Sequence, residues 1–439
     1  MSWSIRRMKG MNIDYSQLPK RSVLCIDVKS FFASVEAVRR KLHPLQAYII
    51  VIANKKLPGS VVLAASPRVK KEFGITTGSR AFEIPPDPRL VLVEPSMKLY
   101  LKVNKMIIRI FQRFVANEDL HIYSIDEAFL DVTASERLFG DKIDIARQIQ
   151  RTVFKELKLV VTIGIGDNPL LAKLALDNEA KDAADGLAYW SYANIRETVW
   201  KIPDLKDMWG VSSGYIKQLH SLGIHSVYEL AHANPYVLKD RLGLLGLQLF
   251  YHAWGVDYSI LSEGSASKEK SFSKSQILMR DYYKLKEIHI VIREMVDEVA
   301  MRLRAHKLTT ARVALGITYT KDIEAKGFRC QMTLDRGTNG TREILTSFQL
   351  LFKKHWHGQP VRQIYISCSK LAPARYEQID FFLSDKMTER NRAIDQVMDE
   401  LRLRFGKGVI FWGCSLQQGG TFLQRVHHVG GHKGETAFD

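Results

Sequence analysis

A segment that cannot build a core of its own divides this chain. Residues 263–275, EGSASKEKSFSKS, are rich in serine and lysine and almost free of large apolar side chains, so they predict a linker. The pattern after it predicts, in order, strand 276–279, helix 282–306, strands 310–319 and 327–334, helix 341–356 and strand 361–370. This β-α-β-β-α-β order favours a compact domain with its helices on one face of a sheet.

The part before the linker mixes short strands with helices, so the fold class is α+β. Predicted strands are 21–28, 48–53, 61–65, two within 121–132, and 159–166; predicted helices are 30–41 after Ser30, 67–73 between Ser66 and Gly74, 96–116, 141–157 and 169–182. Short helices are expected over 191–262, and a helix at 386–405 and a strand at 409–416 near the end. With 439 residues the chain exceeds what one core organises, so several domains are expected.

Basic residues gather in two blocks. Residues 1–100 hold 17 Lys and Arg against 7 Asp and Glu, residues 263–375 hold 21 against 11, and residues 101–190 between them hold 12 against 14. Two basic blocks around an acidic middle indicate a polyanion gripped on both sides of an acid-bearing site. A merely solvated basic surface is the alternative.

Several protein classes are disfavoured. The uncharged stretch 242–256 contains three glycines and is shorter than the roughly 20 residues of a membrane helix, so no span is expected. The four cysteines form no metal-binding or disulfide pattern. The first residues lack a signal peptide's apolar run, and a cytoplasmic location is expected.

Three carboxylates have the placement of a metal site. Asp27 closes an apolar strand, and Asp126 and Glu127 lie at a hairpin-like turn 99 residues later. Acids that converge at a sheet edge can hold two Mg²⁺ ions for phosphoryl transfer. Taken from the residues alone, Asp27 could instead cap the next helix and the other two could lie on an ordinary turn.

The amino-acid sequence around these acids resembles that of a known family. The runs IDVKSFFASVE (26–36) and YSIDEAFLDV (123–132) resemble the two catalytic motifs of the Y-family translesion DNA polymerases, the UmuC/DinB group. The likeness continues through VVLAASPRVKKEFGI (61–75) and IGIGDNPLLAKLALDNEAKDAADG (163–186). It is closest to the UvrX-like branch of Gram-positive bacteria, phages and plasmids.

The resemblance implies a right-hand polymerase architecture. Its parts would be a palm at 20–32 and 97–190, fingers at 33–96, a helical thumb with a helix-hairpin-helix at 191–262, the linker, a little finger at 276–375 and a tail at 376–439.

The resemblance also implies the catalytic ligands. Asp27, Asp126 and Glu127 would bind two Mg²⁺ ions together with the carbonyl of Val28. Relatives often carry a second acid at the position of Lys29, but three acids and a carbonyl suffice.

Nucleotide contacts follow from the same likeness. Phe32 resembles the steric gate that excludes a 2′-hydroxyl, with Phe31 beside it. Arg68, Lys71 and Lys181 stand where the family binds the triphosphate, although many relatives have tyrosine at the first position. A core aromatic and a solvated basic helix face are the alternatives.

Two further segments suggest partners. Gly210, Val211, Gly214 and Lys217 resemble the thumb hairpin that holds duplex phosphates, with Ser212 in place of a usual glycine. Gln378, Ile379, Phe381 and Phe382 resemble the peptide that docks bacterial polymerases on the sliding clamp. An ordinary helical hairpin and a strand end with two packed phenylalanines are the alternatives.

The expected activity is low-fidelity, template-directed addition of dNTPs to a primer 3′-hydroxyl, in DNA damage tolerance and SOS mutagenesis. Expected partners are primer–template DNA, dNTP and the clamp, with a UmuD-like subunit or RecA as candidates. The rival readings are a catalytically silent DNA-binding repair factor of the same fold and a nucleotide cyclase with a palm-like sheet.

Overall fold

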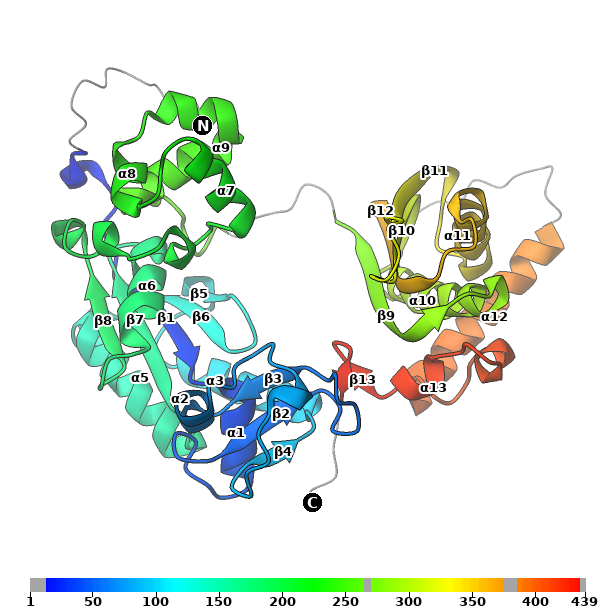
Figure 1. The fold of residues 1–439 in the computed structure, drawn as a ribbon, viewed down its shortest axis with the longest axis horizontal. Coiled ribbons are helices and arrows are strands. Elements are labelled where there is room, and N and C mark those ends of the chain that lie inside the picture. The colour runs from blue at the N-terminus through cyan, green and yellow to red at the C-terminus, as the bar shows by residue number, and fades with distance from the viewer. Residues whose placement is uncertain (1–12, 264–269, 375–384, 435–439) are drawn as a thin grey trace. The chain divides into compact units, whose positions relative to one another are not determined.

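The computed structural model describes residues 13–263, 270–374 and 385–434, without side chains for 385–388. The chain divides into two compact units, residues 1–264 with 432–439, and residues 265–431 (Figure 1). Each unit is described by itself.

A five-stranded sheet forms the centre of the first unit, with strand order β5-β6-β1-β7-β8. The strands are β1 (Val23–Val28), β5 (Leu120–Ile122), β6 (Glu127–Asp131), β7 (Val161–Gly166) and β8 (Leu187–Trp190). Strand β1 is antiparallel to both β6 and β7, and β8 is parallel to β7. The end of β1 is therefore supported on both sides.

Alternate residues of β1 enter two different cores, because successive strand side chains point to opposite faces. Leu24 and Ile26 pack with helices α3 (Met97–Phe111) and α5 (Lys142–Leu157). Val23 and Cys25 pack with α6 (Pro169–Ala175) and with the helices of residues 191–262. Asp27 has the parity of Cys25 and so lies on the α6 side.

Helix α6 approaches the sheet closely at glycine positions of β7. A Cβ atom at Gly164 would stand 2.1 Å from the carbonyl oxygen of Ala172 on α6. This backbone approach brings the residues of α6 against the ends of β1 and β6.

A smaller layer follows β1 in the chain. Helix α1 (Phe31–Arg39) precedes a three-stranded sheet of order β3-β2-β4, made of β2 (Ile49–Ile52), β3 (Val62–Ala65) and β4 (Val91–Val93). Helix α2 (Pro67–Phe73) has proline in its first turn and ends at Gly74 with φ 68°, as the sequence predicts.

Residues 191–262 are helical, with α7 (Ser213–Ser221), α8 (Val227–His232) and α9 (Pro235–Ala253), which bends at Gly243. Helix α4 spans Glu136–Phe139. Short 3-10 turns lie at Tyr15–Gln17, Ala81–Glu83, Asn117–Asp119, Tyr192–Asn194, Val199–Lys201 and Leu205–Asp207, and a π-helical turn at Leu176–Ala180.

The second unit confirms the β-α-β-β-α-β order. It consists of β9 (Phe272–Tyr282), α10 (Leu285–Ala305), β10 (Leu308–Tyr319), β11 (Phe328–Thr338), α11 (Thr341–His355) and β12 (Val361–Pro373), with sheet order β11-β10-β12-β9. Strand β9 begins at Phe272, so the last residues predicted as linker belong to the sheet.

The chain after β12 returns to helix α10. Helix α12 (Asp385–Phe405) pairs Arg402 with Asp297 at 2.7 Å, and Asp399 accepts from Arg304 at 2.6 Å. The predicted strand over 409–416 is wrong, since a 3-10 turn, Gly413–Leu416, stands there. Helix α13 (Phe422–Arg425) and two-residue strands β13 (His428–Val429) and β14 (His432–Lys433) follow.

Candidate active site

The ends of β1 and β6 bring the predicted acids together. Asp27 lies directly opposite Glu127 in the antiparallel register, a spacing of about 5 Å between Cβ atoms. Asp126 precedes Glu127, and its carbonyl accepts a hydrogen bond from the Val28 amide at 3.0 Å. Segments 99 residues apart in sequence thus meet at the same end of neighbouring strands. We call this end of the sheet, with Asp27, Asp126 and Glu127, the acidic edge.

This edge concentrates negative charge. The pKa of Asp27 is raised to about 7, first by burial and then by the nearby charges of Asp126 and Glu127, against the opposing effect of Lys181 and Lys173. A group that is hard to ionise beside two other acids favours a bound cation, which offsets the repulsion.

The donor set fits Mg²⁺ in chemistry, because carboxylate and carbonyl oxygens are its preferred protein ligands. Across the described part of the chain, however, no group of three or more His, Cys, Asp or Glu is already arranged around a cation position. Glu127 is engaged elsewhere: it lies 2.8 Å from the ammonium of Lys173 and accepts from the Cys25 thiol at 3.3 Å. The metal-ligand role of the three acids stays a prediction.

Burial raises the pKa of Cys25 well above that of an ordinary thiol, which keeps the thiol protonated as a donor to Glu127. Asp126 is half-buried and accepts from the Ser124 hydroxyl at 2.6 Å.

Besides Lys173, Lys181 and Lys70 interact electrostatically with Asp27. Lys181 forms an ion pair with Asp177 at 2.7 Å; burial lowers its pKa, but Asp27 and Asp177 raise it more. The pKa of Lys70 is lowered by loss of hydration, which outweighs the attraction of Asp27. Lys70 was not predicted; it is exposed, as is Lys71 beside it on helix α2, and its electrostatic interaction with Asp27 depends on the phase of the helix.

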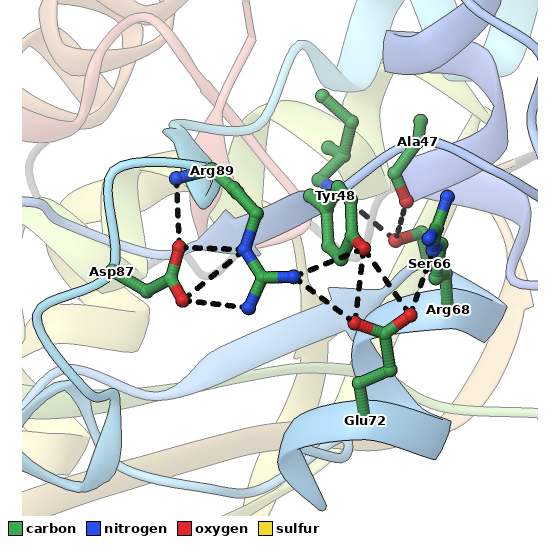
Figure 2. Close-up of polar contacts among 8 residues, drawn as sticks. Ala47, Tyr48, Ser66, Arg68, Glu72, Asp87 and Arg89 are labelled. Atoms are coloured by element: carbon green, nitrogen blue, oxygen red, sulfur yellow. Dashed lines mark hydrogen bonds and ion pairs between the residues drawn. The ribbon is translucent and has the colours of Figure 1, made fainter.

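The guanidinium group of Arg68 contacts residues of the smaller layer around strands β2–β4. Its Nε donates to Glu72 at 2.8 Å, and its guanidinium lies 4.6 Å from the ring centre of Tyr48. Figure 2 shows Arg89 reaching the same carboxylate and tyrosine from the other side. The triphosphate roles predicted for Arg68 and Lys71 have no contact in support among the described residues.

The two adjacent phenylalanines differ in environment. Phe31 is 2% exposed and its side chain packs in the core with Leu24 and Ile26; its predicted nucleotide contact stays a prediction. Phe32 is half-buried and stacks on Tyr100. Its position in the first turn of α1, five residues after Asp27 in the sequence, suits the predicted gate, which stays a prediction.

The predicted phosphate-binding turn lies beside the acidic edge. Gly210 has φ 90° and open space at its Cβ position, Val211 is buried, and Gly214 and Lys217 on α7 are exposed. A cavity of about 580 Å³ lies between this turn and Tyr123, Asp177 and Asn178. The clamp-like residues 378–382 lie outside the described residues.

Comparison with known proteins identifies the family. The impB/mucB/samB family model matches residues 26–177, and its C-terminal domain model matches 269–381. UvrX of Bacillus subtilis (strain 168), a provisionally named UV-damage repair protein, is 42% identical over 96% of this chain and 100% of its own length. DNA polymerase IV 2 of Halalkalibacterium halodurans is 32% identical over 93% of this chain and 98% of its own.

This chain belongs to the family of Y-family DNA polymerases, in the UmuC/DinB group. A solved Y-family DNA polymerase chimera of Dbh and Dpo4 shares the fold, with a TM-score of 0.64, 21% identity, and coverage of 80% of this chain and 99% of the chimera. The Y-family match at 26–177 contains all three predicted acids, and the match at 269–381 contains the sheet of the second unit.

Membership in the Y-family carries general consequences. The fold implies dependence on divalent metal ions and binding of DNA as substrate. Among the described helices of this Y-family chain, none is both long and apolar enough to cross a membrane.

Proposed function

We propose that this chain is a template-directed DNA polymerase of the translesion type, which adds dNTPs to a primer 3′-hydroxyl and releases pyrophosphate. The observation that carries the proposal is the register that sets Asp27 opposite Glu127, with Asp126 adjacent and with Lys181, Lys173 and Lys70 interacting electrostatically with Asp27.

The acids, the lysines and Phe32 would each have a different chemical role. Asp27, Asp126, Glu127 and the carbonyl of Val28 would hold two Mg²⁺ ions. When bound, the ions supply Lewis acidity for the attacking hydroxyl and neutralise the leaving pyrophosphate. Lys181 and Lys70 present fixed positive charge where the triphosphate gains negative charge. The half-buried ring of Phe32 would lie under the sugar.

The second unit supports duplex binding. Its four-stranded sheet and helices α10 and α11 fall within the segment 263–375, which holds 21 basic against 11 acidic residues. Such a surface binds phosphates without reading sequence, so affinity should fall steeply as salt rises.

Primer extension by the purified full chain tests the activity. Asp126→Asn keeps the side-chain shape and removes the charge, so extension should fall by about 10³-fold or more, which is several kcal/mol, while duplex binding persists. Asp131→Asn, at the far end of β6, is the matched control and should stay active.

The same assay separates the alternatives. Extension opposite a UV photoproduct supports the translesion role, which the name of the UvrX relative favours. A wild type that binds duplex DNA but never extends primers would be the silent repair factor instead. A product made from nucleotide without primer would indicate a cyclase.

We further propose a role in damage tolerance under SOS control, with clamp docking through residues 378–382 and with a UmuD-like subunit or RecA as candidate accessories. The clamp proposal is tested by binding of purified bacterial sliding clamp to the wild type and to the double substitution Phe381→Ala, Phe382→Ala. Equal binding by both would contradict it.

A further inference from the structure

A row of alternating charges runs along the segment that packs behind the acidic edge. Lys173 on α6, Asp177 in the π-helical turn and Lys181 after it are spaced four residues apart, which places them on one face. Lys173 Nζ lies 3.0 Å from Asp177 Oδ2, and Lys181 Nζ lies 2.7 Å from Asp177 Oδ1. Asp177 therefore bridges the two lysines.

Lys173 is not a surface charge. Its side chain is 8% exposed, and its ammonium lies 2.8 Å from each carboxylate oxygen of Glu127. Burying a lysine is costly unless it is paired with an acid. The helix thus presents a charged donor to one specific predicted cation ligand.

Glu127 is held from a second direction. The Cys25 thiol on β1 donates to Oε1 of Glu127 at 3.3 Å, and Glu127 itself is 9% exposed. Two buried donors from two elements, β1 and α6, therefore fix the rotamer of this carboxylate. Residues that hydrogen-bond to a metal ligand in this way orient the ligand and raise the affinity for the metal.

We propose that Lys173 and Asp177 are positioning residues of this polymerase. Lys173 holds the Glu127 carboxylate in the orientation that receives the divalent cation. Asp177 bridges Lys173 and Lys181 and so holds Lys181 beside Asp27, which keeps a fixed spacing between the cation site and the triphosphate site. The inference rests on the proposed function, because Glu127 is a cation ligand only there.

Charge and orientation can be separated experimentally. Removing Lys173 alone makes the site more negative, which attracts cations and masks lost orientation. The double substitution Lys173→Met, Asp177→Asn removes one positive and one negative charge, so the net charge of the site is unchanged. Any change in cation affinity then reports orientation.

The readout is Mn²⁺ binding, followed by electron paramagnetic resonance, with the full chain on a dideoxy-terminated primer–template and matching dNTP, where no chemistry occurs. The double variant should bind Mn²⁺ about tenfold more weakly than the wild type. Wild-type affinity or tighter binding in the double variant overturns the proposal.

Two further variants guard against a folding defect. Lys142→Met removes another partly buried lysine of the same unit, paired with Asp167 at 3.7 Å and donating to Tyr189 at 2.8 Å; it should leave Mn²⁺ binding unchanged. Lys173→Arg keeps the charge and the donors, so it should retain Mn²⁺ binding within about threefold of the wild type. A tenfold loss in Lys173→Arg with an intact unfolding midpoint contradicts the proposal.

Asp177→Asn alone tests the second half. Lys173 stays on Glu127, so Mn²⁺ binding persists, whereas Lys181 loses its partner and KM for dNTP should rise about threefold at unchanged kcat. An unchanged KM overturns this half. A wild type that binds Mn²⁺ yet extends no primer defeats the proposed function, whereas a fully competent double variant defeats only the positioning role.

Discussion

The ring of Phe32 stacks on the ring of Tyr100, with 4.5 Å between centroids and 15° between planes. Tyr100 is fully buried and its hydroxyl donates to Glu36 at 3.0 Å, so the tyrosine is fixed. Phe32 is the half-exposed partner. The stacking therefore fixes the position of the Phe32 ring, which would face a nucleotide sugar.

Phe32→Ala removes that ring, and ribonucleotide use should rise by about 10²-fold relative to deoxynucleotides, the scale on which an apolar pocket rejects one hydroxyl. Steady-state primer extension with dNTPs and with rNTPs measures the ratio. Phe31→Leu, a core substitution, is the control. Unchanged sugar discrimination in Phe32→Ala would remove the gate assignment.

Lys70→Ala should raise KM for dNTP about tenfold, because Lys70 adds positive charge near Asp27. Lys71 is its neighbour on the same helix and both lysines are exposed, so Lys71→Ala is the matched control, expected within twofold of the wild type. The reverse order in single-nucleotide kinetics would restore Lys71 as the triphosphate ligand.

Stability should fall below neutral pH through His252 on α9. Burial lowers the pKa of this histidine below its usual value of 6.5, with Asp257 opposing. The folded state then binds fewer protons than the unfolded state, so this contribution is complete above pH 6.5 and is lost as pH falls, by at most about 1.4 kcal/mol per pH unit.

Tryptophan fluorescence during thermal unfolding can follow this effect, since Trp254 packs in the same core. His252→Phe should flatten the dependence between pH 5 and pH 7 relative to the wild type, with pH 8 as reference. Parallel curves for the two proteins would rule out His252 as the titrating group.

Arg402→Met should destabilise the second unit by about 3–5 kcal/mol, because it leaves the Asp297 carboxylate buried without its ion-pair partner and with the Trp412 N–H as a neutral donor. Arg404 on the same helix pairs with Glu400 at 3.9 Å in solvent, so Arg404→Met should change stability by less than about 1 kcal/mol. Urea unfolding measures both. Similar losses in the two variants would contradict a role for burial.

Most strands and helices were predictable because their apolar periodicity matches their burial. Strand β1 and helix α2 are examples, with boundaries close to those expected. The apolar run at 409–416 misled, because it serves contacts with α10 without pairing in a sheet: Trp412 donates to Asp297 at 3.2 Å. Sequence periodicity does not separate these two uses of apolar residues.

The site was predictable only in part. The acids followed from motif and strand ends, whereas the choice between Phe31 and Phe32, and between Lys70 and Lys71, depends on helix phase within one turn. The contact of Lys173 with Glu127 joins residues 46 positions apart. No local sequence pattern around Lys173 on α6 indicates that its partner lies on strand β6.

The alternation along β1 has a further consequence. Asp27 shares its face of the sheet with Cys25, whose core also includes the helices of residues 191–262. Under the proposed function, a primer–template bound at Asp27 would face those helices on the same side of the five-stranded sheet. Moving the duplex by one base pair after each addition would then be a translation along this face, and it would leave the backbone pairing of β1 intact.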